Sequence, residues 1–203
     1  MQSDLSRRSF LRGSALTTAG ATMVNATSAL LAQAETAENS SAAAGGPEAV
    51  AIALQINGAA QTLRVEPRAT LAEVLRGPLG LTGTKIACNR GACSACTVWL
   101  DGSPICSCMM LAIDVGARRV TTVEGLAQGD TLHPVQQAFI DYDALQCGFC
   151  TPGMVMSCAA LLEHKPKPNA DDVRAAISGH VCRCGTYPHV VAATLAAADA
   201  RKA

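Results

Sequence analysis

The sequence predicts an α+β fold in two parts, a small sheet domain followed by an all-α domain. Three observations support this. The pair Asn57-Gly58 separates two strand-like segments, which is a strong hairpin signal. From about residue 132 onward, apolar residues recur at helical spacing. The ten cysteines form two groups, one in each part, so each part is expected to hold its own site.

The first part, residues 49–124, reads as a β-grasp unit. Thr70 can cap a short helix over residues 71–76, which Gly77-Pro78 ends. Asp101-Gly102 marks a second turn. The expected strands cover about residues 49–56, 61–65, 97–100, 118–123 and a segment running from 103 into Cys106 and Cys108.

The second part, residues 125–203, reads as four helices around a second site. They are expected over about residues 132–142, 152–163, 170–178 and 190–200. Pro152 suits the first turn of a helix. The clip formed by Cys147 and Cys150 would therefore lie at a helix N-terminus, where the macrodipole and free N–H groups stabilise thiolates.

The N-terminus has the pattern of an export signal. Arg7-Arg8 precedes a weakly apolar stretch that ends in Ala32-Gln33-Ala34, which predicts a twin-arginine signal over residues 1–34. Residues 35–48 are rich in Ala, Ser and Gly and read as a flexible linker. We therefore expect a periplasmic protein, exported already folded, that does not span the membrane.

The charge balance argues against nucleic acid as a partner. Of 16 basic and 16 acidic residues, three arginines and one aspartate lie in the signal, so the remainder is slightly acidic. Nucleic-acid binding needs a basic face, which this composition does not supply.

The first cysteine group has the spacing of a plant-type [2Fe–2S] site. Cys88, Cys93 and Cys96 form C-x4-C-x2-C, and Cys108 follows after eleven intervening residues. Disulfides need matched partners and gain most from long loops, so three cysteines within nine residues suit them badly. On a strand, Cys106 and Cys108 share a face, and spacing alone leaves either as the fourth ligand.

The second group combines a C-x2-C clip at Cys147 and Cys150 with a C-x-C clip at Cys182 and Cys184. Four converging thiolates suit structural zinc as well as an iron–sulfur cluster, and the spacing does not separate the two. Cys158 lies among apolar residues and is expected to be a buried structural thiol.

Beyond the cysteines, the motifs resemble a known family. Leu81-Thr82-Gly83-Thr84-Lys85 before the first group, Gln146-Cys147-Gly148-Phe149-Cys150-Thr151-Pro152-Gly153, and Cys182-Arg183-Cys184-Gly185 are similar to the iron–sulfur subunits of the xanthine dehydrogenase family of molybdenum hydroxylases. Within that family, the chain is most similar to the separate small subunits of bacterial aldehyde and N-heterocycle oxidoreductases.

The resemblance implies two [2Fe–2S] clusters. One is held by Cys88, Cys93, Cys96 and Cys108, which leaves Cys106 out, and the other by Cys147, Cys150, Cys182 and Cys184. Gln146 and Cys184 would touch the molybdopterin cofactor of a large catalytic subunit. Electrons from the oxidative hydroxylation of an aldehyde or N-heterocycle would pass through both clusters to an FAD subunit or a haem-bearing cytochrome c. This chain would carry no substrate chemistry.

Two positions depart from the family pattern, since Ser94 and Ala87 stand where glycine is usual. Where φ must be positive, a non-glycine residue costs about 1 kcal/mol. The Ser94 hydroxyl is also a candidate donor to a cluster sulfur, which would raise the cluster potential.

Two other functions fit the cysteine pattern less well. One is a free-standing two-cluster ferredoxin, and the other is an interaction module stabilised by zinc or disulfides. The glutamine beside Cys147 favours the subunit of a larger enzyme, because a diffusible ferredoxin needs no pterin-facing surface.

Overall fold

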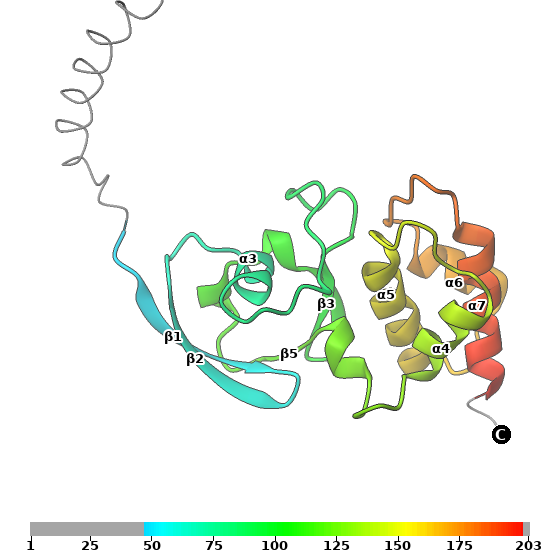
Figure 1. Ribbon diagram of the computed structural model, residues 1–203, viewed down its shortest axis with the longest axis horizontal. Helices are drawn as coiled ribbons and strands as arrows, with labels where there is room; N and C mark the ends of the chain where they lie inside the picture. The colour runs from blue at the N-terminus through cyan, green and yellow to red at the C-terminus, as the bar shows by residue number, and fades with distance from the viewer. Residues whose placement is uncertain (1–46, 201–203) are drawn as a thin grey trace, which may run out of the picture. The chain divides into compact units, whose positions relative to one another are not determined.

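The computed structural model describes residues 47–200 as a mixed structure of one small sheet and several helices (Figure 1). The mixed α and β composition predicted from the sequence is confirmed. The predicted signal, residues 1–34, and residues 35–46 of the predicted linker lie outside the described residues. Within residues 47–200, no helix is both long enough and apolar enough to cross a bilayer.

The sheet has five strands in the order β2-β1-β5-β3-β4. Asn57 and Gly58 both have positive φ, 51° and 80°, as a tight hairpin turn between β1 and β2 requires. β5 joins the two hairpins, because it pairs in parallel with β1 and antiparallel with β3. The strands are β1 (Val50–Ile56), β2 (Ala59–Val65), β3 (Thr97–Leu100), β4 (Ser103–Cys106) and β5 (Arg119–Thr121).

Helix α3 (Leu71–Arg76) covers the sheet and is capped by Thr70, as predicted, in a capping box with Glu73. The Thr70 hydroxyl accepts the backbone N–H of Glu73, and the Glu73 carboxylate accepts the backbone N–H of Thr70. Its buried side chains pack with those of β1, β3 and β5 in one core. Its Ala72 contacts Cys96 and Cys108, so this helix lies directly beneath the first cysteine group.

Cys108 does not lie on a strand, contrary to the sequence prediction. β4 ends at Cys106, and Cys108 lies in a 3₁₀ turn, η1 (Ser107–Met109). Ser107 causes the change, because its backbone N–H and its hydroxyl both donate to the carbonyl of Cys96, at 3.3 and 2.7 Å. The turn places Cys108 beside Cys96. Two further 3₁₀ turns, η2 (Ala112–Asp114) and η3 (Val123–Leu126), flank β5.

The side chain of Asn57 ties the first hairpin to the end of β5. Its Nδ2 donates to Thr122 Oγ1 at 3.0 Å, and its Oδ1 accepts the Thr122 backbone N–H at 2.9 Å. Its backbone N–H donates to the carbonyl of Val120 at 2.9 Å. We call this arrangement the Asn57 clasp. It joins segments separated by 65 residues of sequence.

The helical part contains α4 (Pro134–Asp141), α5 (Thr151–His164), α6 (Ala170–Ala176) and α7 (Tyr187–Ala200). α5 begins directly after Cys150, as the position of Pro152 predicts. α7 begins three residues earlier than expected, because the carbonyl of Thr186 already accepts the N–H of Val190 in a helical bond.

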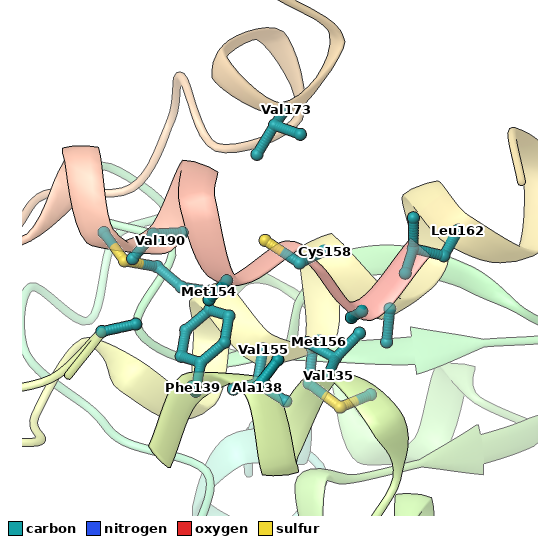
Figure 2. Close-up of a cluster of buried hydrophobic side chains, with 14 of the residues drawn as sticks. Val135, Ala138, Phe139, Met154, Val155, Met156, Cys158, Leu162, Val173 and Val190 are labelled. Carbon is teal, nitrogen blue, oxygen red and sulfur yellow. The ribbon is translucent and has the colours of Figure 1, made fainter. Parts of the chain in front are cut away.

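α5 is the central helix and is buried along most of its length. Figure 2 shows side chains of α4 and α5 packed together, with Phe139 beside Met154 and with Val173 of α6 and Val190 of α7 completing the cluster. α5 also contacts β3, so it lies between the other helices and the sheet (Figure 1). Trp99 of β3 packs on the same core, and its Nε1 donates to the carbonyl of Met156 at 2.8 Å.

Candidate metal centres

The loop from Cys88 to Cys96 turns its backbone N–H groups toward thiols. Asn89, Gly91 and Ser94 all have positive φ, at 50°, 72° and 56°. The N–H groups of Arg90 and Ala92 point to Cys88 Sγ at 3.5 and 3.3 Å, and the N–H of Gly91 reaches Cys108 Sγ at 3.3 Å. Successive inward N–H groups of this kind form a concavity that stabilises negative charge.

The four predicted thiols of the first group lie together. Cys88 lies close to Cys93, and Cys108 lies close to Cys96 and Cys88. The N–H of Arg90, with the Cys93 contact, lowers the pKa of the Cys88 thiol to about 7. Burial, with the Cys96 contact, raises the pKa of Cys108 to about 11. The group therefore has an open edge at Cys88 and a buried edge at Cys108.

Cys106 faces other partners. Its Sγ lies 3.9 Å from the carbonyl oxygen of Gly91 and 3.8 Å from the hydroxyl of Ser94. The Ser94 hydroxyl therefore lies against Cys106, which is outside the predicted ligand set, and not against a predicted ligand thiol. Ala87, the other departure from the family pattern, does not have a positive φ.

The second group is held by two loops. Cys150 caps α5, Cys147 is exposed three residues earlier, and Cys182 reaches them from the loop between α6 and α7. Cys150 lies close to both Cys182 and Cys147. Burial, followed by the Cys182 contact, raises the pKa of Cys150 to about 12. Cys184 is half-buried two residues beyond Cys182, and the contacts that join the other three thiols do not include it.

The Cys182 loop is braced by polar side chains that sequence reasoning missed. The Tyr187 hydroxyl accepts the N–H of Cys182 at 2.8 Å and donates to the carbonyl of His180 at 2.9 Å. Thr186 Oγ1 lies 3.4 Å from Cys182 Sγ. Burial alone would raise the pKa of Cys182, but hydrogen bonds led by Thr186 outweigh it and lower the pKa to about 7. Only the closeness of these residues to Cys182 and Cys184 in sequence signals their role.

His180 is a structural residue. It is 5% exposed, its Nε2 lies 2.7 Å from Ser157 Oγ of α5, and burial lowers its pKa to about 4. A neutral His180 therefore fastens the segment before Cys182 onto α5. Cys158 is fully buried, and burial raises its pKa to about 12, which agrees with the predicted structural thiol.

The thiol arrangement fits two-iron clusters. In the first group, Cys88 lies close to Cys93 and Cys108 lies close to Cys96 and Cys88, and in the second group Cys150 lies close to Cys182 and Cys147. A [2Fe–2S] cluster takes four thiolates, two on each iron. These neighbouring thiols and the inward N–H groups of the first loop suit that donor set.

An apolar face lies beside the second group. Gln146 and Phe149 are exposed on either side of Cys147. A groove of about 240 Å³ runs alongside, with a wall that includes Ile140, Leu145 and Pro152. Exposed apolar side chains gathered around a redox-type site are typical of a protein interface.

Family models identify three segments. A 2Fe-2S iron-sulfur cluster binding domain matches residues 54–125, and a [2Fe-2S] binding domain matches residues 122–195. A TAT (twin-arginine translocation) pathway signal sequence matches residues 4–24. The two cluster-binding models overlap over residues 122–125.

Curated relatives cover most of the chain. The aldehyde oxidoreductase iron-sulfur-binding subunit PaoA of Escherichia coli (strain K12) is 37% identical over 204 residues, covering 93% of this chain and 86% of that protein. The nicotine 6-hydroxylase small subunit of Paenarthrobacter nicotinovorans is 45% identical over 146 residues, covering 72% of this chain and 88% of that protein.

Among solved structures, quinoline 2-oxidoreductase from Pseudomonas putida 86 contains a similar chain. The TM-score is 0.73 and the identity 43%, covering 76% of this chain and 97% of the other. An aldehyde oxidoreductase from Desulfovibrio desulfuricans gives a TM-score of 0.71 at 42% identity, covering 75% of this chain and 17% of that larger one.

Proposed function

This chain belongs to the [2Fe–2S] iron–sulfur small subunits of the molybdenum hydroxylases, and from that membership we propose that it carries electrons between two partner subunits. The source is a molybdopterin site in a large catalytic subunit. The acceptor is an FAD subunit or a cytochrome c. The overall reaction is the oxidative hydroxylation of an aldehyde or an N-heterocycle.

The observation that carries the proposal is a direct bond between the two cysteine groups. The backbone N–H of Val181 donates to the carbonyl of Cys93 at 3.2 Å. Cys93 belongs to the first group, and Val181 immediately precedes Cys182 of the second. One hydrogen bond therefore completes a short route of bonded atoms from one group to the other.

Each group of residues has a part in this function. Cys88, Cys93, Cys96 and Cys108 hold one cluster, in a β-grasp domain, and Cys147, Cys150, Cys182 and Cys184 hold the other, in a four-helix domain. The bound clusters supply the one-electron oxidation and reduction. The protein holds them close together, keeps water from the buried ligands Cys108 and Cys150, and fixes the Cys182 loop through Tyr187.

The large subunit docks on the face around Gln146. This face supplies an exposed amide next to Cys147, the half-buried Cys184, and the apolar groove beside Leu145. Gln146 and Cys184 contact the pterin there. The acceptor meets the opposite group at its open edge, where Cys88 is half-buried between exposed residues such as Asn89 and Arg90.

The twin-arginine signal indicates where the complex works. Export by this route delivers a protein folded around its cofactors, so the assembled complex functions in the periplasm. Cluster insertion then precedes export.

Metal analysis tests the cofactors. We expect four irons and four acid-labile sulfides per chain, with the visible absorption of [2Fe–2S] clusters, because each cluster contains two of each. A colourless protein with stoichiometric zinc would refute the proposal. Purification without any large molybdenum-containing subunit would favour a free-standing ferredoxin.

Gln146→Ala tests the direction of electron entry. In the assembled complex, we expect both clusters to remain and their reduction by substrate to slow, since the pterin contact is lost. Stopped-flow absorption measures this after the complex is mixed with a substrate that it oxidises, chosen from nicotine, quinoline and aldehydes. Gln137→Ala, which removes an exposed glutamine on α4 bonded to Asp141, is the matched control. Loss of the clusters in Gln146→Ala would make this residue structural instead.

A further inference from the structure

The two cysteine groups meet across a close contact between backbones. On one side is the segment Cys93-Ser94-Ala95 of the first loop. On the other side are the first turn of α5 and the segment from Gly179 to Val181, joined to the loop by the Val181–Cys93 hydrogen bond. We call this contact the joint.

Gly153 lies where the joint is tightest. A Cβ at this position would lie 2.4 Å from the carbonyl oxygen of Ser94 and 3.2 Å from that of Ala95. No folded protein accommodates the shorter distance, so a side chain would push the loop away from α5. Gly153 lies within a helix and has no positive φ, so its backbone conformation does not require glycine. Glycine costs a helix about 1 kcal/mol relative to alanine. The close approach of the loop is what requires it.

Gly179 makes a second, softer contact. A Cβ there would lie 3.2 Å from Ser94 Oγ, which is a side-chain atom that can move. Ser94 therefore touches both glycines, Gly153 with its backbone carbonyl and Gly179 with its hydroxyl. Its φ of 56° permits glycine at this position without strain.

We propose that Gly153 and Gly179 are positioning residues that set the distance between the two clusters, and with it the rate of electron transfer between them. The inference rests on the proposed function. Each transfer oxidises the helical-domain cluster by one electron and reduces the sheet-domain cluster by one.

The positions of the glycines make this effect direct. Gly153 is three residues after Cys150, and Gly179 is three residues before Cys182. The loop that they contact carries Cys93 and Cys96 on either side of Ser94 and Ala95. A shift at either glycine therefore moves proposed ligands of one cluster relative to those of the other. Electron tunnelling falls steeply with distance, so a small separation slows the transfer without changing any ligand.

Gly153→Ala in the full-length protein, purified with its accompanying subunits, tests the proposal. We expect iron and sulfide content and both midpoint potentials to stay at the parent values. The magnetic splitting between the two dithionite-reduced clusters, measured by electron paramagnetic resonance, should diminish or vanish, since this interaction falls with distance. In stopped-flow experiments with substrate, reduction of the helical-domain cluster should keep its parent rate. Reduction of the sheet-domain cluster should be slower than in the parent protein.

A second pair of variants separates spacing from general damage. Gly179→Ala should weaken the splitting less than Gly153→Ala. Adding Ser94→Gly should restore the splitting in Gly179→Ala, because the contact is with Ser94 Oγ. The same addition should not restore it in Gly153→Ala, where the contact is with the Ser94 backbone.

Three outcomes would overturn the proposal. One is a parent-like splitting in Gly153→Ala with both clusters present. Another is rescue of both variants, or of neither, by Ser94→Gly. The last is loss of a cluster in both glycine variants, which would make the glycines requirements for assembly. A parent protein without two clusters would instead refute the proposed function, so the two failures are distinguishable.

Discussion

At the scale of single residues, a turn separates Cys106 from Cys108, the proposed fourth ligand of the first cluster. Cys106 and Cys108 are two residues apart, and the sequence alone left either as a ligand. The bonds from Ser107 to the carbonyl of Cys96 end the strand between them. As a result, Cys108 receives the N–H of Gly91 and contacts Cys96, whereas Cys106 faces Ser94.

We expect Cys108→Ser to lose or strongly alter the first cluster, and Cys106→Ser to keep it. Serine conserves size at both positions, and only Cys108 belongs to the proposed ligand set. Iron content and the resonance spectrum of the reduced protein distinguish the two variants. A parent-like spectrum in Cys108→Ser, with the cluster lost in Cys106→Ser, would reverse the assignment.

At the scale of elements, the capping box of α3 supports the first site from below. Thr70 fixes the first turn of this helix, and Ala72 in the same turn contacts Cys96 and Cys108. Fraying of the first turn of α3 would therefore also weaken the packing of Ala72 against Cys96 and Cys108.

Thr70→Ala should lower the free energy of unfolding by about 1 kcal/mol, the usual cost of losing a helix N-cap. Urea unfolding followed by far-ultraviolet circular dichroism measures this. Thr82→Ala, at an exposed position in the next loop, should have little effect. Equal losses in the two variants would show that the cap contributes nothing of its own.

Elements with local signals were predictable from the sequence. The hairpin at Asn57-Gly58, the helix capped by Thr70 and the helix opened by Pro152 each depend on residues within one turn of each other. The start of α7 was placed too late, because the N-cap signal of Thr186, whose carbonyl accepts the first helical bond, and the first-turn signal of Pro188 were not used.

Features that depend on distant residues were not predictable. Trp99 bonds to Met156 and Cys93 to Val181, across 57 and 88 positions of sequence. The spacing of the cysteines predicted two sites, but nothing in it showed that a hydrogen bond and two closely packed glycines lie between the two cysteine groups. The brace of Tyr187 on the Cys182 loop was missed for the same reason, since only the folded loop reveals it.

At the scale of the whole molecule, the sheet part and the helical part share an interface, and Trp99 lies in it. The Trp99 indole packs on the helical core, and its N–H donates to the carbonyl of Met156 in α5. A substitution at Trp99 should therefore lower the stability of both the sheet part and the helical part.

Trp99→Phe should lower the unfolding midpoint of both parts together. The lost hydrogen bond is worth about 1 kcal/mol, and the smaller ring adds a packing loss. Circular dichroism reports on the helices, and visible absorption reports on the clusters. Tyr142→Phe, at an exposed aromatic residue, is the control. A shift in only one signal would show that the two parts unfold independently.

The Asn57 clasp has a consequence for the order in which the chain folds. β1 and β2 form a local hairpin, but β1 gains its other neighbour only when β5 arrives, because Gln55 pairs with Arg119 and Ile56 with Val120. Pairings between distant segments form slowly, since the chain between them must be ordered first. The hairpin must therefore wait, with one edge of β1 unpaired, until the segment that includes both Cys88 and Cys108 has been synthesised. Closure of the clasp then marks completion of the sheet around the first site.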